Sequence, residues 1–192
     1  MKAFEFTIKF SLGDADAAPG SYIDRLYGAG CDDALIGIGK TGMIALDFIR
    51  EADNALEAVM SAVEDVKRVI PDAQLVEATP DLVGLTDIAD LVGLSRQYIR
   101  RLRVSNHTFP APFHEGKSAI WHLEYVLNWF QSSNTVAVDS LKSLIEVANV
   151  NRQINTVKES RNVDPQVNKR LSVLALRAAG PGSEMYTPKE ST

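Results

Sequence analysis

The sequence predicts an α+β protein, and three observations carry that prediction. Apolar and polar residues alternate between Phe4 and Phe10, which is the period of a half-buried strand. Between Ala55 and Val69 the apolar residues recur at helical spacing instead. The 192 residues are 45% hydrophobic and 23% charged, which is typical of a globular chain with one large domain or two small ones.

The first 80 residues have the pattern β-α-β-β-α-β. After the first strand we expect a helix at 22–27, strands at 34–38 and 43–48, a helix at 55–69 and an edge strand at 75–76. Pro71 stops the second helix. This order predicts a ferredoxin-like sandwich.

One loop of this segment has part of a phosphate-binding motif. Gly39, Lys40 and Thr41 match the end of G-x-x-x-x-G-K-[ST], but Ala34 stands where the first glycine belongs. The motif must also begin a helix, and the residues that follow Gly42 have the pattern of a strand. We therefore predict a hairpin turn at residues 39–42.

The charge is unevenly distributed along the chain. Residues 1–81 contain 7 Lys and Arg against 15 Asp and Glu, a net charge of −8, whereas residues 82–131 are at +1 and residues 132–192 at +2. Four of the five cations in the middle segment are Arg96, Arg100, Arg101 and Arg103. Because charges act over a Debye length of about 8–10 Å, this local cluster is attractive to phosphate on an acidic chain. The acidic segment is expected to face a protein partner, a sister subunit or a small ligand.

Two short helices joined by a glycine turn are predicted in the middle segment. Thr86 is expected to cap a helix at 87–92, Gly93 provides the turn, and Ser95 caps a second helix at 96–103. This is a helix-turn-helix. Guanidinium groups match guanine edges, a carboxamide matches adenine, and further arginines neutralise phosphate. The expected outward-facing or phosphate-binding residues are Ser95, Arg96, Gln97, Arg100, Arg101 and Arg103.

A β-hairpin and a closing helix follow. Residues 109–113 (FPAPF) are stiff and extended, 114–117 form a turn, 118–121 a strand and 123–130 a helix. Together with the helix-turn-helix, these elements predict a winged helix.

The segment from Leu85 to Trp129 resembles the excisionase-like winged helix-turn-helix domain of the MerR superfamily. The likeness covers about 48 of the 192 residues and rests on Leu85, Asp87, Ile88, Ala89, Val92, Gly93, Leu94 and Ser95, then Phe109, Pro110 and Pro112, then Trp121 and Trp129. At the end of the segment Tyr125 separates the acid Glu124 from Val126, where the family has the two adjacent.

The resemblance implies that the second helix binds the major groove and that the wing contacts the backbone or the minor groove. Base contacts would come from Arg96, Gln97, Tyr98 and Arg100, and wing contacts from His114 and Lys117.

Simpler interpretations compete at several positions. The arginine run could be a solvated helix face, and Trp121 and Trp129 are expected in the core rather than stacked on bases. The three histidines lack the i, i+3 or i, i+4 pairing of a helical metal site, so no metal is expected. Cys31 is the single cysteine, so a disulfide framework is excluded. We expect Cys31 in the core or at a strand edge.

Two amphipathic helices are expected in residues 135–179. The first has an apolar stripe from Leu141 to Ala148, and the second begins at Asp164-Pro165 and continues the stripe through Val167, Leu171 and Leu174. Their apolar faces predict either a dimer interface or packing on their own domains. Residues 180–192 are expected to form a flexible tail.

The favoured function is a dimeric, sequence-specific regulator that binds double-stranded DNA. An antitoxin-like repressor, or an accessory factor for phage or mobile-element recombination, is the alternative, and both would also bind a protein. An enzyme is disfavoured because the sequence contains no acid–base pair, nucleophile–histidine set or intact phosphate loop, and no cofactor is expected. The absence of a signal-peptide pattern or an apolar span predicts a cytoplasmic protein without membrane contact.

Overall fold

A computed structural model describes residues 1–13, 18–133, 135 and 141–178. The chain divides into two compact units, Met1–Thr156 and Val157–Thr192, and each is treated by itself. The predicted tail at 180–192 lies outside the described residues, as does most of the connection before residue 141. Among the described helices, none combines the length and apolar content needed to cross a membrane.

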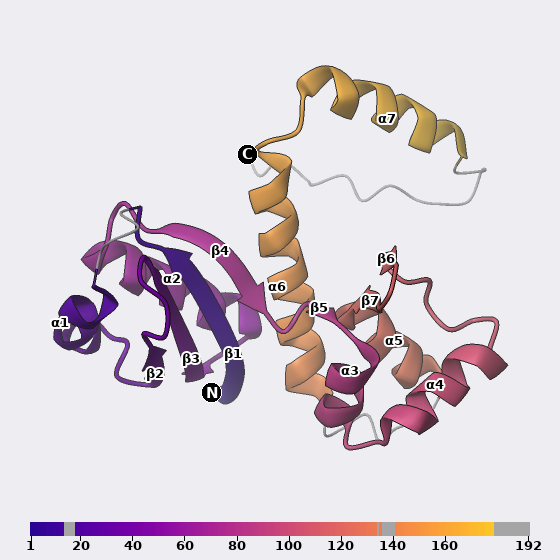
Figure 1. Cartoon of the computed structure of the whole chain (residues 1–192), viewed down its shortest axis with the longest axis horizontal. Coiled ribbons are helices and arrows are strands. Elements are labelled where there is room, and N and C mark those ends of the chain that lie inside the picture. Colours follow the sequence, from indigo (N-terminus) through magenta and orange to yellow (C-terminus); the bar gives the residue numbers. More distant parts are fainter. Residues whose placement is uncertain (14–17, 134, 136–140, 179–192) are drawn as a thin grey trace. The chain divides into compact units, whose positions relative to one another are not determined.

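The first unit begins with a four-stranded sheet in the order β2-β3-β1-β4, in which each neighbouring pair is antiparallel (Figure 1). The order of the elements along the chain is the predicted one. They are β1 (Lys2–Ser11), a 3-10 turn (Pro19–Tyr22), α1 (Ile23–Gly28), β2 (Ala34–Gly37), β3 (Met43–Ala52), α2 (Ala55–Val69) and β4 (Gln74–Thr79).

The apolar pattern explains which face of this sheet is buried. The alternating residues Phe4 to Phe10 of β1 enter a core with Leu46 and Phe48 of β3, and α2 covers them with its apolar stripe. Helix α2 begins where the Asn54 side chain accepts a hydrogen bond from the Glu57 N–H at 2.9 Å. The opposite face of the sheet carries the other residues of each alternation.

Residues 39–42 connect β2 to β3 as a turn, as predicted. Gly42 has φ +72°, and the Met43 N–H donates to the Lys40 carbonyl at 3.1 Å. A strand rather than a helix follows, so the partial phosphate-binding motif does not lie at a helix N-terminus.

The next elements surround a second hydrophobic core. They are β5 (Leu82–Val83), α3 (Leu85–Val92), α4 (Arg96–Ser105), β6 (His114–Glu115), β7 (Ala119–His122) and α5 (Leu123–Ser132). The strands form a small antiparallel sheet in the order β5-β7-β6. Strand β5 was not predicted, because two apolar residues show no period.

Helix α6 (Lys142–Ser160) contacts both cores of the first unit. Val147 and Val150 belong to the core under the four-stranded sheet, and Ala148 belongs to the second core. Of the two predicted C-terminal helices, this first one therefore packs on its own chain. The second is α7 (Pro165–Ala178), whose apolar residues Leu171 and Leu174 are exposed.

Candidate nucleic-acid interface

The predicted turn between the two short helices is present and is built around Gly93. Its φ is +68°, a left-handed conformation that favours glycine. The Leu94 N–H donates to the Ala89 carbonyl at 2.9 Å and closes the end of α3. The Ser95 hydroxyl then accepts from the Tyr98 N–H at 3.2 Å, so Ser95 caps α4 as predicted.

The predicted cap of α3 is wrong. The helix begins at Leu85 rather than Asp87, and Gly84 rather than Thr86 is the N-cap residue. The Asp87 carboxylate reaches back and accepts the Gly84 N–H at 2.7 Å, which satisfies a backbone donor that the cap would otherwise leave unpaired.

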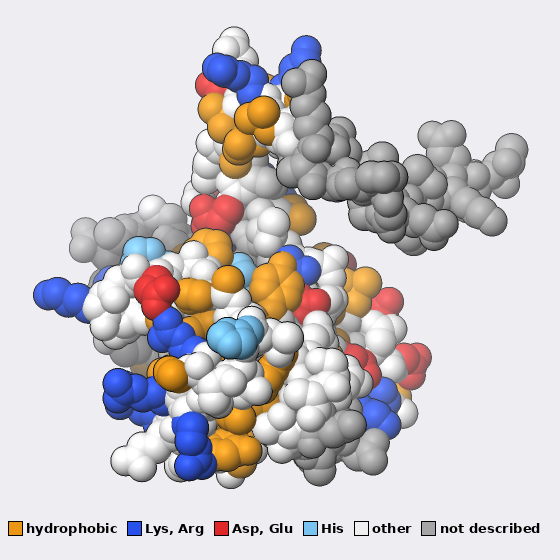
Figure 2. All heavy atoms as spheres, turned by 90° about the vertical axis from the view of Figure 1, so that its right-hand side faces the viewer, with side chains coloured by type: hydrophobic (Ala, Val, Ile, Leu, Met, Phe, Trp, Pro, Cys, Tyr) orange, Lys and Arg blue, Asp and Glu red, His pale blue; other side chains and the backbone are white. Residues whose placement is uncertain are grey.

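Helix α4 presents an exposed face of donors. Arg96, Gln97, Arg100 and Arg101 are exposed, while Ile99 is completely buried and anchors the helix. Among the residues that the structure describes, no carboxylate forms an ion pair with Arg96, Arg100 or Arg101. In Figure 2 several Lys and Arg side chains lie along the left and lower edges of this part of the molecule.

Two of the predicted DNA-contacting residues are less available than the others. Tyr98 is half-buried against the second core, and the Arg101 guanidinium lies 5.2 Å from the centre of its ring. Arg103 forms an ion pair with Glu115, its side chain is 31% exposed, and its guanidinium lies 5.1 Å from the Trp121 ring. Arg103 was predicted on the outer surface, but its guanidinium already contacts Glu115 and the Trp121 ring.

The β6–β7 hairpin lies next to α4 through that ion pair. His114 pairs with Ile120 and Glu115 with Ala119, so residues 116–118 form the tip. His114 and Lys117 are both exposed, and Lys117 has no ion pair with a described residue. The structure thus brings the helix and hairpin candidates to one part of the molecule.

Both tryptophans were expected in the core, but they differ in burial: Trp129 is half-buried and packs against the second core. Trp121 is buried and its indole N–H donates to the Pro110 carbonyl at 3.0 Å. The Trp129 N–H donates to the Thr108 hydroxyl at 3.0 Å. Phe109 packs edge-on against both rings.

A buried polar network behind the hairpin was not predicted. Asp81 is almost fully buried, and its carboxylate lies 2.7 Å from His122 Nδ1 and accepts from Asn155 Nδ2 at 2.8 Å. Asn155 also bonds both the N–H and the carbonyl of Ala78, which covers the edge of β4. Because these residues are 41 and 74 positions apart, no local pattern in the sequence could reveal them.

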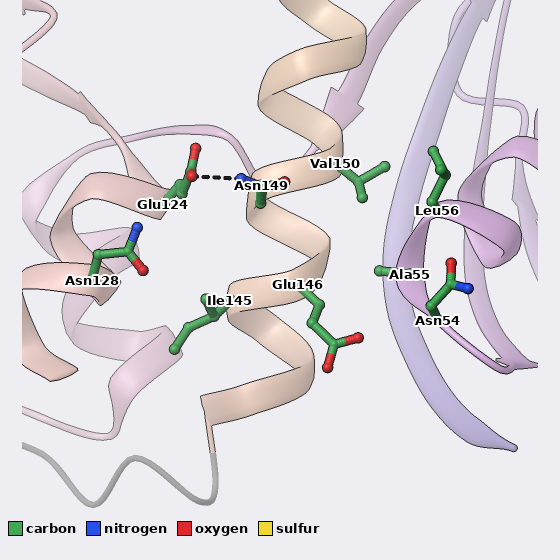
Figure 3. Close-up of a pocket in the computed structure, with 9 residues that line it drawn as sticks. All are labelled: Asn54, Ala55, Leu56, Glu124, Asn128, Ile145, Glu146, Asn149 and Val150. Carbon is green, nitrogen blue, oxygen red and sulfur yellow. Dashed lines mark hydrogen bonds between the residues drawn. The ribbon is translucent and has the colours of Figure 1, made fainter. Parts of the chain in front are cut away.

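Glu124 attaches α5 to α6. Its carboxylate accepts from Asn149 Nδ2 at 2.6 Å and forms an ion pair with Arg152. The hydrogen bond with Glu124 raises the pKa of Arg152 above its ordinary value. Glu124 and Asn149 are among the residues that line a pocket of about 370 Å³. Figure 3 shows these lining residues, which come from α5, from α6 and from the start of α2. Both carboxylate oxygens of Glu124 are engaged, so this acid holds the helices together.

The first core contains a second buried charge network that was not predicted. Arg50 donates to both carboxylate oxygens of Asp33 and to Asp65 at 2.8–2.9 Å. Burial alone would lower the pKa of Arg50, but its hydrogen bonds with these two acids raise it. Cys31 lies nearby and is fully buried, in agreement with the predicted core position. Within the described residues, no cluster of histidine, cysteine and acidic side chains could hold a metal.

No protein-family model, curated protein or solved structure matches the chain.

Proposed function

We propose that the protein is a sequence-specific regulator of transcription that binds double-stranded DNA as a homodimer. In this proposal residues 82–131 are a winged helix-turn-helix of the excisionase-like, MerR-superfamily type. Residues 1–80 are a ferredoxin-like sandwich. The winged helix is supported by the succession of α3, α4, the hairpin and α5. The ferredoxin-like sandwich is supported by the all-antiparallel strand order β2-β3-β1-β4.

The observation that carries the proposal is that α4 presents exposed arginines that form no ion pair with a described residue. Arg96 and Arg100 are exposed and have no ion pair with a described carboxylate. A guanidinium without a protein partner can donate two hydrogen bonds to guanine O6 and N7, and Gln97 can do the same for adenine. Arg101 and Lys117 are suited to phosphate, which fixes the register of α4 in the major groove.

The rest of the chain supports a division of roles. The net charge of −8 over residues 1–81 repels phosphate, so the duplex is expected to contact α4 and the hairpin alone. The paired Arg103 is then a positioning residue, which holds the wing beside the helix, and it is not expected to contact a base.

Genome-wide footprinting of the tagged protein would identify its sites, and a duplex from one of them would serve for affinity measurements. Arg96→Ala and Arg100→Ala are expected to cost about 1–3 kcal/mol each and to relax base preference. Arg161→Ala removes the same charge from an exposed position outside α4 and is the matched control.

Two results would overturn the proposal. One is a footprint without a preferred sequence. The other is a folded Arg96→Ala, Arg100→Ala double variant that binds the duplex as tightly as the Arg161→Ala control.

A further inference from the structure

The sheet of residues 1–80 has one face that the helices of the first unit leave uncovered. Its large exposed apolar residues are Leu35 on β2 and Ile49 on β3, which are 72% and 62% exposed. We call this surface the open sheet face and define it by Leu35, Ile49 and the exposed acids Glu5, Asp47 and Glu51. The strand pairing places Leu35 beside Asp47 and Ile49 beside Glu5, so apolar and acidic side chains alternate across the strands.

The charge on this face is not neutralised by the chain itself. Among the described residues, no cation forms an ion pair with Glu5, Asp47 or Glu51. Lys9, which lies on the same face, is already paired with Glu77 at 2.9 Å. A partner for the open sheet face should therefore be apolar along its centre and basic at its margin.

Helix α7 has this chemistry. Val167, Leu171 and Leu174 follow the spacing i, i+4, i+7, and the two leucines are 59% and 61% exposed. The fourteen residues of α7 contain Lys169, Arg170 and Arg177 and no acid. At 100° per residue Arg170 lies at the margin of the stripe, whereas Lys169 lies on the opposite side. An isolated helix of this length is marginal in water, so α7 needs a surface to cover its stripe.

We propose that α7 of one copy packs on the open sheet face of a second copy, and that the contact is reciprocal. The dimensions agree, because a helix of fourteen residues is about 21 Å long and four strands span roughly 19 Å. Leu171 and Leu174 then cover Leu35 and Ile49, while Arg170 approaches the acids. A two-fold axis makes this contact twice, which doubles the apolar surface removed from water.

The proposed occupant is a second copy rather than the α7 of the same chain. A reciprocal contact between two copies covers both α7 stripes and both open sheet faces at once, as a two-fold axis requires.

The proposal identifies the interface of the homodimer proposed above, and in that respect it rests on the proposed function. Its test measures assembly without DNA, so the two can fail separately. We expect light scattering on the full chain to give twice the mass of 21.0 kDa. Leu171→Glu with Leu174→Glu should raise the dimer dissociation constant more than roughly tenfold, and Ile49→Glu should do the same from the other surface. All three positions are exposed, so these variants keep the fold, which circular dichroism would verify.

Charge exchange provides the matched controls. Arg170→Glu should weaken the dimer and Lys169→Glu should leave it unchanged, although both reverse one charge on the same helix. Combining Arg170→Glu with Asp47→Lys in one chain should restore assembly. A monomeric wild-type chain would overturn the proposal, whether α7 then covers its own sheet or binds another protein. A dimer that survives the two leucine substitutions would overturn it as well.

Discussion

Arg103 of α4 and Glu115 of β6 form an ion pair, which joins the candidate recognition helix to the hairpin. Glu115 is the only acid between Leu94 and Lys117. The single acid of this region therefore pairs with Arg103. The other three arginines of α4 form no ion pair with a described residue.

We expect Arg103→Ala and Arg101→Ala to have different effects on the salt dependence of DNA binding. An arginine that contacts phosphate contributes about one to the slope of log K against log salt. Arg101→Ala should reduce the slope by roughly this amount, whereas Arg103→Ala should leave it nearly unchanged because Glu115 already pairs with Arg103. Binding isotherms at several salt concentrations would measure both, and equal slopes for the two variants would contradict the assignment.

Glu115→Gln should steepen the salt dependence. The substitution removes a negative charge and releases the Arg103 guanidinium toward phosphate, so we expect the slope to become larger by about one. Base preference should weaken at the same time, because the hairpin is no longer held beside α4. The Glu115 side chain is 60% exposed, so the free energy of unfolding should fall by no more than about 1 kcal/mol.

Asp81→Ala should destabilise the first unit by about 2–3 kcal/mol. His122 and Asn155 are half-buried, and the substitution removes the carboxylate that both contact. Urea denaturation would measure the difference. Asp90→Ala is the control, because Asp90 is exposed and should change stability by no more than about 0.5 kcal/mol. Equal stabilities for the two variants would exclude a structural role for the network.

Arg50→Ala should lower the free energy of unfolding by about 3–5 kcal/mol, because it leaves Asp33 and Asp65 without their buried counter-charge. Arg68 pairs with the same Asp65 from a side chain that is 62% exposed. Arg68→Ala should therefore cost no more than about 1 kcal/mol. Thermal and urea denaturation of the two variants would measure both losses of stability. Equal losses for Arg50→Ala and Arg68→Ala would contradict the prediction.

The stability of the fold should fall at alkaline pH because of Cys31. Burial raises the pKa of its thiol from 9.0 to about 11, and Asp65 adds to the effect. The unfolded chain loses this proton near pH 9 and the folded chain retains it to about pH 11, so the free energy of unfolding decreases between these values. The full effect is about 3 kcal/mol. Cys31→Ala should flatten the decrease, and parallel stability curves for the variant and the wild type would refute this origin.

Local patterns predicted the helices that have a long apolar period or a clear capping residue. Helix α2 was predicted at 55–69 and found there, because its apolar period runs over fifteen residues and Pro71 follows. Helix α4 was predicted from Ser95 and extends two residues beyond Arg103. The cap of α3 was missed because the decisive group, the Asp87 carboxylate, lies inside the helix and acts backwards on Gly84.

The features that could not be predicted depend on contacts between distant residues. Strand β5 is defined only by pairing with β7, and Arg103 was placed outside because its partner lies on another element. The same holds for Asp81, Arg50 and Glu124, whose surroundings are formed by three or more segments. For the candidate interface, sequence reasoning therefore identified the residues, and the structure distinguished the unpaired arginines from the paired one.

Helix α6 sets the smallest fragment that can be expected to work alone. The sequence predicts a winged helix within residues 82–131, but its core also needs α6. Ala148 belongs to that core, Asn155 hydrogen-bonds Asp81, and Arg152 forms an ion pair with Glu124. Because Val147 and Val150 of the same helix complete the other core, cutting the chain before residue 141 would leave unsealed apolar surface on both halves. Transplanting residues 82–131 to another protein would therefore require carrying α6 along with them.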